Sequence, residues 1–113
     1  MWPRAHSLND MCEITYKREN GEFSITASGH ADKDGGPVCA AVSAYFYLIA
    51  QGLELWQDDM ILDKAVRLEP GDSEVSAKFD SAIADSASIQ WDTVALGFLM
   101  LQDNYPDKVR VSL

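Results

Sequence analysis

The chain has 113 residues, of which 47% are hydrophobic and 10% aromatic, enough for one domain with a modest two-layer core and too many for a disordered chain. Its formal charge of −9, from 9 basic and 18 acidic residues, argues against a nucleic-acid-binding surface, because phosphate contacts require clustered Lys and Arg. Its two cysteines are too few for a disulfide framework or a thiolate zinc site, so we expect a reduced, soluble, cytoplasmic protein.

Residues 1–10 differ from the rest of the chain because their apolar residues follow no periodic pattern. They also lack the apolar core of a signal peptide. Met11 would serve equally well as a start, since the regular pattern begins just after it. We therefore interpret residues 1–10 as a tail or an upstream-start extension, discount His6 as a catalytic group, and expect a single domain over residues 11–113.

The first predicted element is a β-hairpin. Alternating apolar residues begin at Cys12 and continue on both sides of Asn20-Gly21, a dipeptide that strongly favours a tight hairpin turn. His30 falls just past the end of the second strand, and a loop rich in Gly and Pro follows over Asp32–Pro37. The pattern therefore places a histidine where a strand ends and an irregular loop begins.

A helix is predicted from Cys39 to Leu55. Its first turns have almost no polar face, which is typical of a helix that is buried on several sides or packs against a second subunit. The longest apolar run, from Val38 to Ala50, is well short of a membrane span, so we expect no membrane-spanning segment.

A second hairpin and a second helix follow. Residues 64–80 alternate on both sides of a turn at Pro70-Gly71-Asp72. Apolar residues at three- and four-residue steps then predict a helix from about Asp85 to Gln102, with Asp85 or Ser86 as its N-cap. Tyr105-Pro106-Asp107 ends this helix, because proline cannot continue the helical hydrogen bonds.

The order strand-strand-helix-strand-strand-helix-strand predicts an α+β fold. We expect a two-layer sandwich with one sheet of about five strands, made of the two hairpins and a short C-terminal strand over Lys108–Leu113, and with both helices on the faces of the sheet. No internal repeat or low-complexity segment is visible.

His30 and Cys39, nine positions apart around the flexible loop, are the most informative residues for function. A thiol in the first turn of a helix lies near unpaired N–H groups and the positive end of the helix dipole, so we expect a lowered pKa and a usable nucleophile. An imidazole within loop-closing distance supplies the matching base. The backbone N–H groups of Cys39 and Ala40 are candidate oxyanion donors. If the two side chains meet, they predict a cysteine hydrolase.

Three further residues are candidates to support this pair. Asp32 and Asp34 are near enough in sequence to orient the imidazole, although they are equally well explained as solvated loop carboxylates. Ser43 lies four residues after Cys39, hence on the same helix face, where its hydroxyl can hydrogen-bond near the thiolate or to the Cys39 carbonyl.

Other site types fit poorly. Asp32-Lys33-Asp34-Gly35 resembles the start of a calcium loop, but Gly36 and Ser43 stand where a third oxygen ligand and a glutamate are required. We therefore expect no metal and no cofactor. Cys39 also has a purely structural interpretation as a small buried hydrophobic residue, and Cys12 is expected to be inert.

The segments Gly29-His30-Ala31, Val38-Cys39-Ala40-Ala41-Val42-Ser43 and Gly52-Leu53-Glu54 resemble the ribosomal-processing cysteine protease family called Prp. The resemblance covers nearly all of residues 11–113, including the closing segment 105–111. It implies a homodimeric endopeptidase that removes a short N-terminal extension from a large-subunit ribosomal protein. It also implies that His30 is the base and Cys39 the nucleophile, and that Ser43 matches the family's serine.

Alternatives follow from two differences. The interval between His30 and Cys39 is shorter than is typical of that family, and Gly36 stands where the family usually has an aspartate. A phage- or element-borne relative that processes a capsid or scaffold protein is one alternative, and a non-catalytic binding module of the same fold is another. A redox-sensing thiol is a third, with Cys12 as the resolving partner, and would require the two sulfur atoms to be close. As partner we expect a protein substrate, such as the basic N-terminal segment of a ribosomal protein, with no direct nucleic acid and no membrane.

Overall fold

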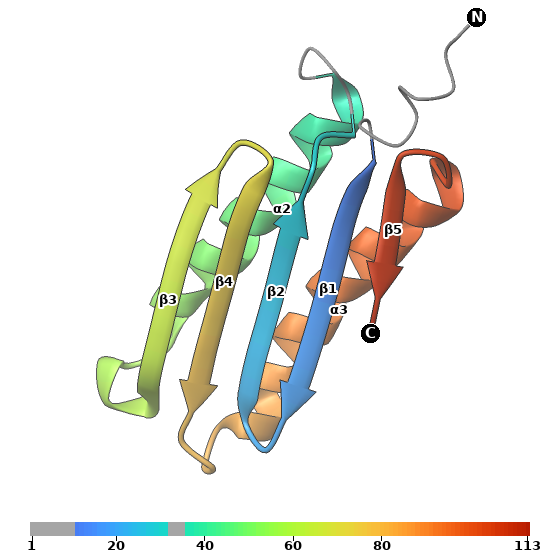
Figure 1. The fold of residues 1–113 in the computed structure, drawn as a ribbon. Helices are drawn as coiled ribbons and strands as arrows, with labels where there is room; N and C mark the ends of the chain where they lie inside the picture. The colour runs from blue at the N-terminus through green and yellow to red at the C-terminus, as the bar shows by residue number, and fades with distance from the viewer. Residues whose placement is uncertain (1–10, 32–35) are drawn as a thin grey trace, which may run out of the picture.

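The structure, a computed structural model, describes residues 11–31 and 36–113 and contains one five-stranded sheet under two helices (Figure 1). The predicted tail over residues 1–10 lies outside the described residues. The elements in chain order are β1 (Cys12–Glu19), β2 (Glu22–Ser28), α2 (Pro37–Gly52), the short 3-10 helices η1 (Leu53–Leu55) and η2 (Asp58–Met60), β3 (Ile61–Glu69), β4 (Asp72–Phe79), α3 (Ala84–Asn104) and β5 (Val109–Ser112). The predicted two-layer α+β fold is confirmed.

The two predicted hairpins pair with each other to form the centre of the sheet, whose strand order is β3-β4-β2-β1-β5. β1 pairs antiparallel with β2 across Asn20 and Gly21, whose φ angles of 51° and 81° match the tight turn expected for this dipeptide. β2 pairs antiparallel with β4, and β4 with β3. β5 adds to the free side of β1 in parallel, with Cys12 opposite Val109, so the sheet is mixed.

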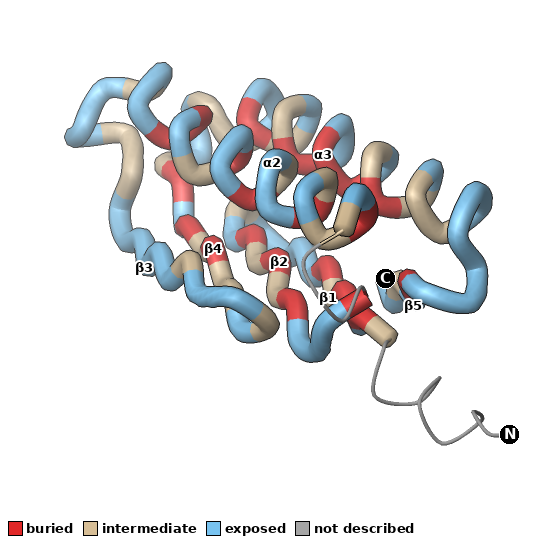
Figure 2. The backbone as a smooth tube through the Cα atoms, turned by 90° about the horizontal axis from the view of Figure 1, so that it is seen from above, coloured by how far each residue is buried: buried red, intermediate tan, exposed pale blue. Residues whose placement is uncertain are grey.

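Both helices lie on the same face of the sheet, which corrects the expectation that they occupy its faces (Figure 2). Only one face of the central strands is apolar; the residues that alternate with it, such as Ser24 and Thr26 of β2, are polar and partly exposed. The two helices also contact each other. The ring of Tyr45 lies edge-on to Phe98 with ring centroids 5.3 Å apart, and it packs against Gly97 where a larger residue would not fit without a shift.

The core fills the space between the sheet and the helices. Trp91 of α3 is fully buried and stacks on Phe23 of β2, with ring centroids 5.5 Å apart. Phe46 of α2 meets Phe98 of α3 at 5.5 Å. These contacts attach each helix to the sheet or to the other helix, so the helical layer is held in one position.

The ends of both helices differ slightly from the prediction. α2 begins at Pro37, two residues before the predicted start, because proline is well suited to the first helical position. The last predicted turn, Leu53–Leu55, is the separate 3-10 helix η1. α3 begins at Ala84 after Ile83, so neither Asp85 nor Ser86 is its N-cap. The side chain of Asp80 instead accepts a hydrogen bond from the Ala82 amide and forms the turn that leads into the helix.

The apolar segment around α2 is longer than the sequence pattern indicated. By length and composition alone, the 19 residues of Pro37–Leu55 would be sufficient to cross a membrane. In the structure, one side of this segment is in the core: Val38, Val42, Phe46 and Ile49 are buried. Packing against the sheet and α3 therefore accounts for the apolar face of α2.

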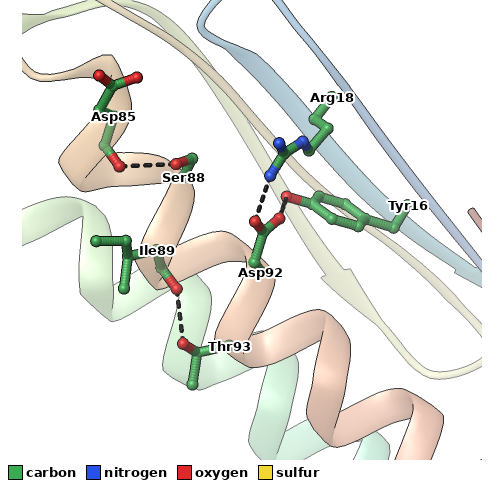
Figure 3. Close-up of polar contacts among 7 residues, drawn as sticks. All are labelled: Tyr16, Arg18, Asp85, Ser88, Ile89, Asp92 and Thr93. Carbon is green, nitrogen blue, oxygen red and sulfur yellow. Dashed lines mark hydrogen bonds and ion pairs between the residues drawn. The ribbon is translucent and has the colours of Figure 1, made fainter.

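A polar link ties α3 to β1 (Figure 3). It lies toward one end of β1, and the opposite end of the strand pairs with Ser28, close to His30 in the chain. Tyr16 donates a hydrogen bond to one carboxylate oxygen of Asp92 at 2.7 Å, and Arg18 pairs with the other. Burial opposes ionisation of Asp92, but the hydrogen bonds from Arg18 and Tyr16 outweigh it and lower the pKa of Asp92 below its ordinary 3.8. The link therefore stabilises the fold above that pH, and this contribution is lost as the pH falls through the lowered pKa.

We expect Tyr16→Phe to lower the free energy of unfolding by about 1 kcal/mol, because it removes one partly buried hydrogen bond and leaves the ring in place. Urea denaturation measures the change. Tyr105→Phe is the matched control, since Tyr105 is exposed and takes part only in backbone hydrogen bonds among the described residues. Equal stabilities of Tyr16→Phe and the control would contradict the role assigned to this link.

Candidate active site

Cys39 lies in the first turn of α2, as predicted. The helix begins with Pro37 at its first position, so Cys39 is its third residue. Its side chain is partly buried and packs against the core between sheet and helices. The positive end of the α2 dipole therefore lies near this thiol.

His30 is the second residue after β2, following Gly29, and is exposed to solvent. The loop between His30 and Cys39 is anchored on both sides, because Ala31 and Val38 are each only 1% exposed. These two buried residues hold the strand end and the helix start in the same region of the core. The loop connects two fixed points, although residues 32–35 themselves lie outside the described part of the chain.

The second hairpin supports the imidazole from the other side. The Gly29 N–H donates a hydrogen bond to the Gly71 carbonyl at 3.0 Å, which extends the pairing of β2 and β4 up to His30. A Cβ atom on Gly71 would lie 2.8 Å from Cε1 and 2.9 Å from Cδ2 of His30. Gly71 also has φ 72°, a conformation that favours glycine. The ring therefore rests on the turn between β3 and β4, where only glycine leaves room for it.

One pocket of about 450 Å³ contains both predicted groups. His30 and Cys39 line it, together with Ala40 and Ser43, and Ser43 is exposed one turn after Cys39. The structure thus brings together the four described residues that the sequence singled out. Asp34, proposed as a supporting residue, and Asp32 lie outside the described residues.

The Ala40 amide does not fit the oxyanion role expected of it. Its N–H donates to the Gly36 carbonyl at 3.0 Å, which is a hydrogen bond of the helix itself. The helix starts earlier than predicted, at Pro37, so Ala40 is far enough into it to find an i−4 acceptor. The positive end of the helix dipole still favours a negative charge nearby, but the Ala40 N–H is already bonded within the helix and is not a donor for an oxyanion.

The rest of the pocket comes from residues that local sequence patterns did not identify. The turn between β3 and β4 forms one wall, and Val42, Phe46 and Tyr47 of α2 form an apolar side. Glu69 and Asp72 add carboxylates to the wall, but Asp72 is paired with Arg67 at 2.9 Å. The Pro70-Gly71-Asp72 turn was visible in the sequence, whereas its position beside His30 depends on the pairing of β2 with β4.

Cys12 is a further member of this pocket. It is 3% exposed at the start of β1. Burial, then the negative charges of Cys39 and Glu13, raise the pKa of the Cys12 thiol to about 11. The thiol is therefore protonated near neutral pH, which agrees with the prediction that Cys12 is not itself a nucleophile.

A more open hollow of about 1010 Å³ lies between α3 and the far end of β1 and β2. Tyr16, Asp92, Leu96 and Leu113 are among its lining residues, and no cysteine or histidine of the described part of the chain is. Over residues 11–31 and 36–113, no group of three or more His, Cys, Asp and Glu side chains could hold a metal ion. We therefore place the candidate active site in the smaller pocket around Cys39.

Comparison with known proteins connects this geometry to one family. The family model described as cysteine protease Prp matches residues 11–110, and no curated protein matches the chain. The SMU.848 protein of Streptococcus mutans is 20% identical with a TM-score of 0.64, over 90% of this chain and 92% of that chain. The essential ribosomal processing protease Prp from S. aureus, in complex with a covalently linked product peptide, is 16% identical with a TM-score of 0.68, over 90% and 98% of the two chains. Its complex with a substrate peptide is also 16% identical, with a TM-score of 0.64 over 90% of this chain and 98% of that chain. At these identities the solved structures establish a shared fold.

We expect Gly71→Ala to displace the His30 ring, because the new methyl group would occupy the space of the imidazole. NMR of the imidazole nitrogens measures this directly, as a shift of the His30 resonances. Gly21→Ala is the matched control, because Gly21 has a similar φ of 81° at the opposite end of β2 and would carry a similar backbone strain. His30 signals that respond equally to both substitutions, or to neither, would contradict the proposed support.

Proposed function

The chain belongs to the cysteine protease Prp family, and we propose that it is an endopeptidase with Cys39 as the nucleophile and His30 as its general base. The observation that carries this proposal is the single pocket lined by both side chains, with the thiol in the first turn of α2. The two residues belong to different elements: His30 comes after β2, and Cys39 lies in the first turn of α2. Their common pocket is therefore a product of the tertiary fold.

In the proposed reaction, His30 accepts the proton of the Cys39 thiol, and the thiolate sulfur attacks the carbonyl carbon of the scissile peptide bond. The developing oxyanion is stabilised by the positive end of the α2 dipole. His30 then gives its proton to the leaving amine as the C–N bond breaks, which leaves a thioester on Cys39. Water, deprotonated by His30, attacks the thioester and releases the new carboxylate and the thiol. Ser43 lies along the same helix face and is in position to contact the substrate or the thiolate.

The proposed substrate is a basic protein segment, in particular the N-terminal extension of a large-subunit ribosomal protein. The apolar side of the pocket suits an apolar side chain near the scissile bond, and the net charge of −9 attracts a basic chain. The S. aureus protease of similar fold carries a peptide in its structures and is described as a ribosomal processing protease. A cytoplasmic location is part of the same proposal, since it is where we expect this substrate to be processed.

We also propose that the protein acts as a homodimer. The helical layer exposes large apolar side chains: Tyr47 and Leu48 on α2 are 56% and 59% exposed, and Leu96 and Met100 on α3 are 56% and 57% exposed. Apolar residues exposed on neighbouring helices are typical of a surface that another protein covers. A second copy of the chain is the occupant that the family resemblance favours.

We expect Cys39→Ala and His30→Ala to lower cleavage of a precursor ribosomal protein by at least about a thousandfold while the circular dichroism spectrum stays unchanged, since each removes a group that forms or breaks bonds. His6→Ala is the matched control for the second variant and should cleave like wild type. Mass spectrometry of the products identifies the cleaved bond. Undiminished cleavage by either site variant would overturn the proposed dyad.

An alkylation experiment separates a protease from a binding module. If Cys39 is the nucleophile, iodoacetamide should alkylate it at neutral pH faster in the folded protein than in the urea-unfolded chain, because the thiolate is the reactive form. Alkylation of Cys39 that is no faster in the folded protein, combined with peptide binding but no cleavage, would favour the non-catalytic alternative.

Glu69 lines the pocket and makes no ion pair among the described residues, although the Arg67 charge acts on it from a distance, so we expect it to attract a basic residue of the substrate. Glu69→Gln should raise KM for a basic peptide about two- to fivefold and leave kcat nearly unchanged, as an exposed charge contributes at most about 1 kcal/mol. The effect should shrink in high salt. Glu54→Gln is the matched control, because Glu54 is exposed on η1 and is not among the residues of the pocket. A KM raised equally by both substitutions would assign the effect to net charge.

A further inference from the structure

Cys12 occupies a specific position under the candidate active site. In the antiparallel pair of β1 and β2, Glu13 stands opposite Ser28, which puts Cys12 next to Gly29 and one residue from His30. The backbones approach so closely here that a Cβ atom on Gly29 would collide with the Met11 carbonyl oxygen and would lie 3.9 Å from the Cys12 Cα atom. The start of β1 is thus held directly against the segment that carries the predicted base.

The side chain of Cys12 points toward the helical layer, since it shares the buried face of β1 with Ile14 and Tyr16. Cys39, at the start of α2, packs against the same buried cluster, and both cysteines line the same pocket. They are the only two cysteines of the chain, and both are thiols in the structure. The charge of Cys39 also acts on Cys12, which indicates that the two sulfur atoms lie within electrostatic range of each other.

We propose that Cys12 is a resolving thiol that converts an oxidised Cys39 into a reversible Cys12–Cys39 disulfide. A hydroperoxide is the oxidant: the Cys39 thiolate attacks its distal oxygen, the O–O bond breaks, and Cys39 becomes a sulfenic acid as an alcohol or water leaves. The Cys12 sulfur then attacks the sulfenic sulfur, the S–S bond forms, the S–O bond breaks, and water leaves with the thiol proton. A dithiol reductant returns two electrons and restores both thiols.

The electrostatics of the pair give these steps an order. While Cys39 is a thiolate, the burial of Cys12 and, after it, the Cys39 charge keep the Cys12 thiol protonated, so Cys12 does not compete for a peptide substrate. Sulfenic acid is neutral, and once Cys39 carries it, the contribution of the Cys39 charge is removed. Cys12 therefore becomes a better nucleophile only after Cys39 has been oxidised. The disulfide masks Cys39 and protects it from irreversible oxidation to the sulfinic acid.

This proposal rests on the proposed function insofar as Cys39 must be a reactive thiol, but its test does not require cleavage. The full chain is treated with hydrogen peroxide at neutral pH, remaining thiols are blocked with N-ethylmaleimide, and the protein is digested and mapped by mass spectrometry. We expect a peptide pair joined through Cys12 and Cys39, within one chain and independent of protein concentration. Dithiothreitol should restore labelling of both residues.

Cys12→Ala and Cys12→Val, two substitutions that suit a buried site, separate a resolving role from a structural one. In both variants we expect Cys39 to proceed to sulfinic acid, with recovery of thiol labelling by dithiothreitol reduced about tenfold or more relative to wild type. Wild-type protein that accumulates sulfinic acid at Cys39 while Cys12 stays labelled would overturn the proposal, as would a disulfide formed only between chains. A protein that cleaves but never forms the internal disulfide refutes only this inference; one that forms it but never cleaves refutes only the proposed protease.

Discussion

The candidate active site depends on the pairing of β2 with β4. Through this pairing, the Gly29 N–H reaches the Gly71 carbonyl, and the turn between β3 and β4 becomes the surface on which the His30 ring rests. Without it, His30 would lie at the end of a two-stranded hairpin with no turn beside its ring. The strand pair also places one wall of the pocket beside the start of α2, so one set of backbone hydrogen bonds positions His30 relative to Cys39.

The elements that depend on local patterns were predictable from the sequence. Asn20-Gly21 and Pro70-Gly71 specify turns through their own backbone preferences, and the apolar runs around Phe46 and Trp91 specify helices with a buried face. The pairing of the two hairpins, and with it the wall of the pocket, was not predictable. It joins residues far apart in sequence, and no local pattern selects the partner of β2. For the same reason the helices were not assigned to a single face.

The beginning of α2 illustrates how a small shift in an element changes a chemical assignment. Cys39 was expected in the first turn and lies there, but the helix starts at Pro37 and the Ala40 amide is consumed by the helix. α2 also has two roles that place its residues in different surroundings. Its buried residues, such as Ile49, hold the core together, while its first turn carries the partly buried Cys39 at the wall of the pocket. The buried residues Ala31 and Val38 allow both roles. They anchor the two sides of the loop between His30 and Cys39, so that the apolar core ends at the edge of the pocket.

The contact between Gly29 and Gly71 also determines when the site can exist. The two residues are separated by the whole of α2 and β3, so closing this contact is a late, non-local event in folding compared with forming either hairpin or either helix. A nascent chain that has emerged only as far as α2 already carries both His30 and Cys39, yet it lacks the wall that supports the imidazole. The complete pocket therefore arises only in a chain whose sheet is assembled, and the geometry itself delays any chemistry until folding has reached β4.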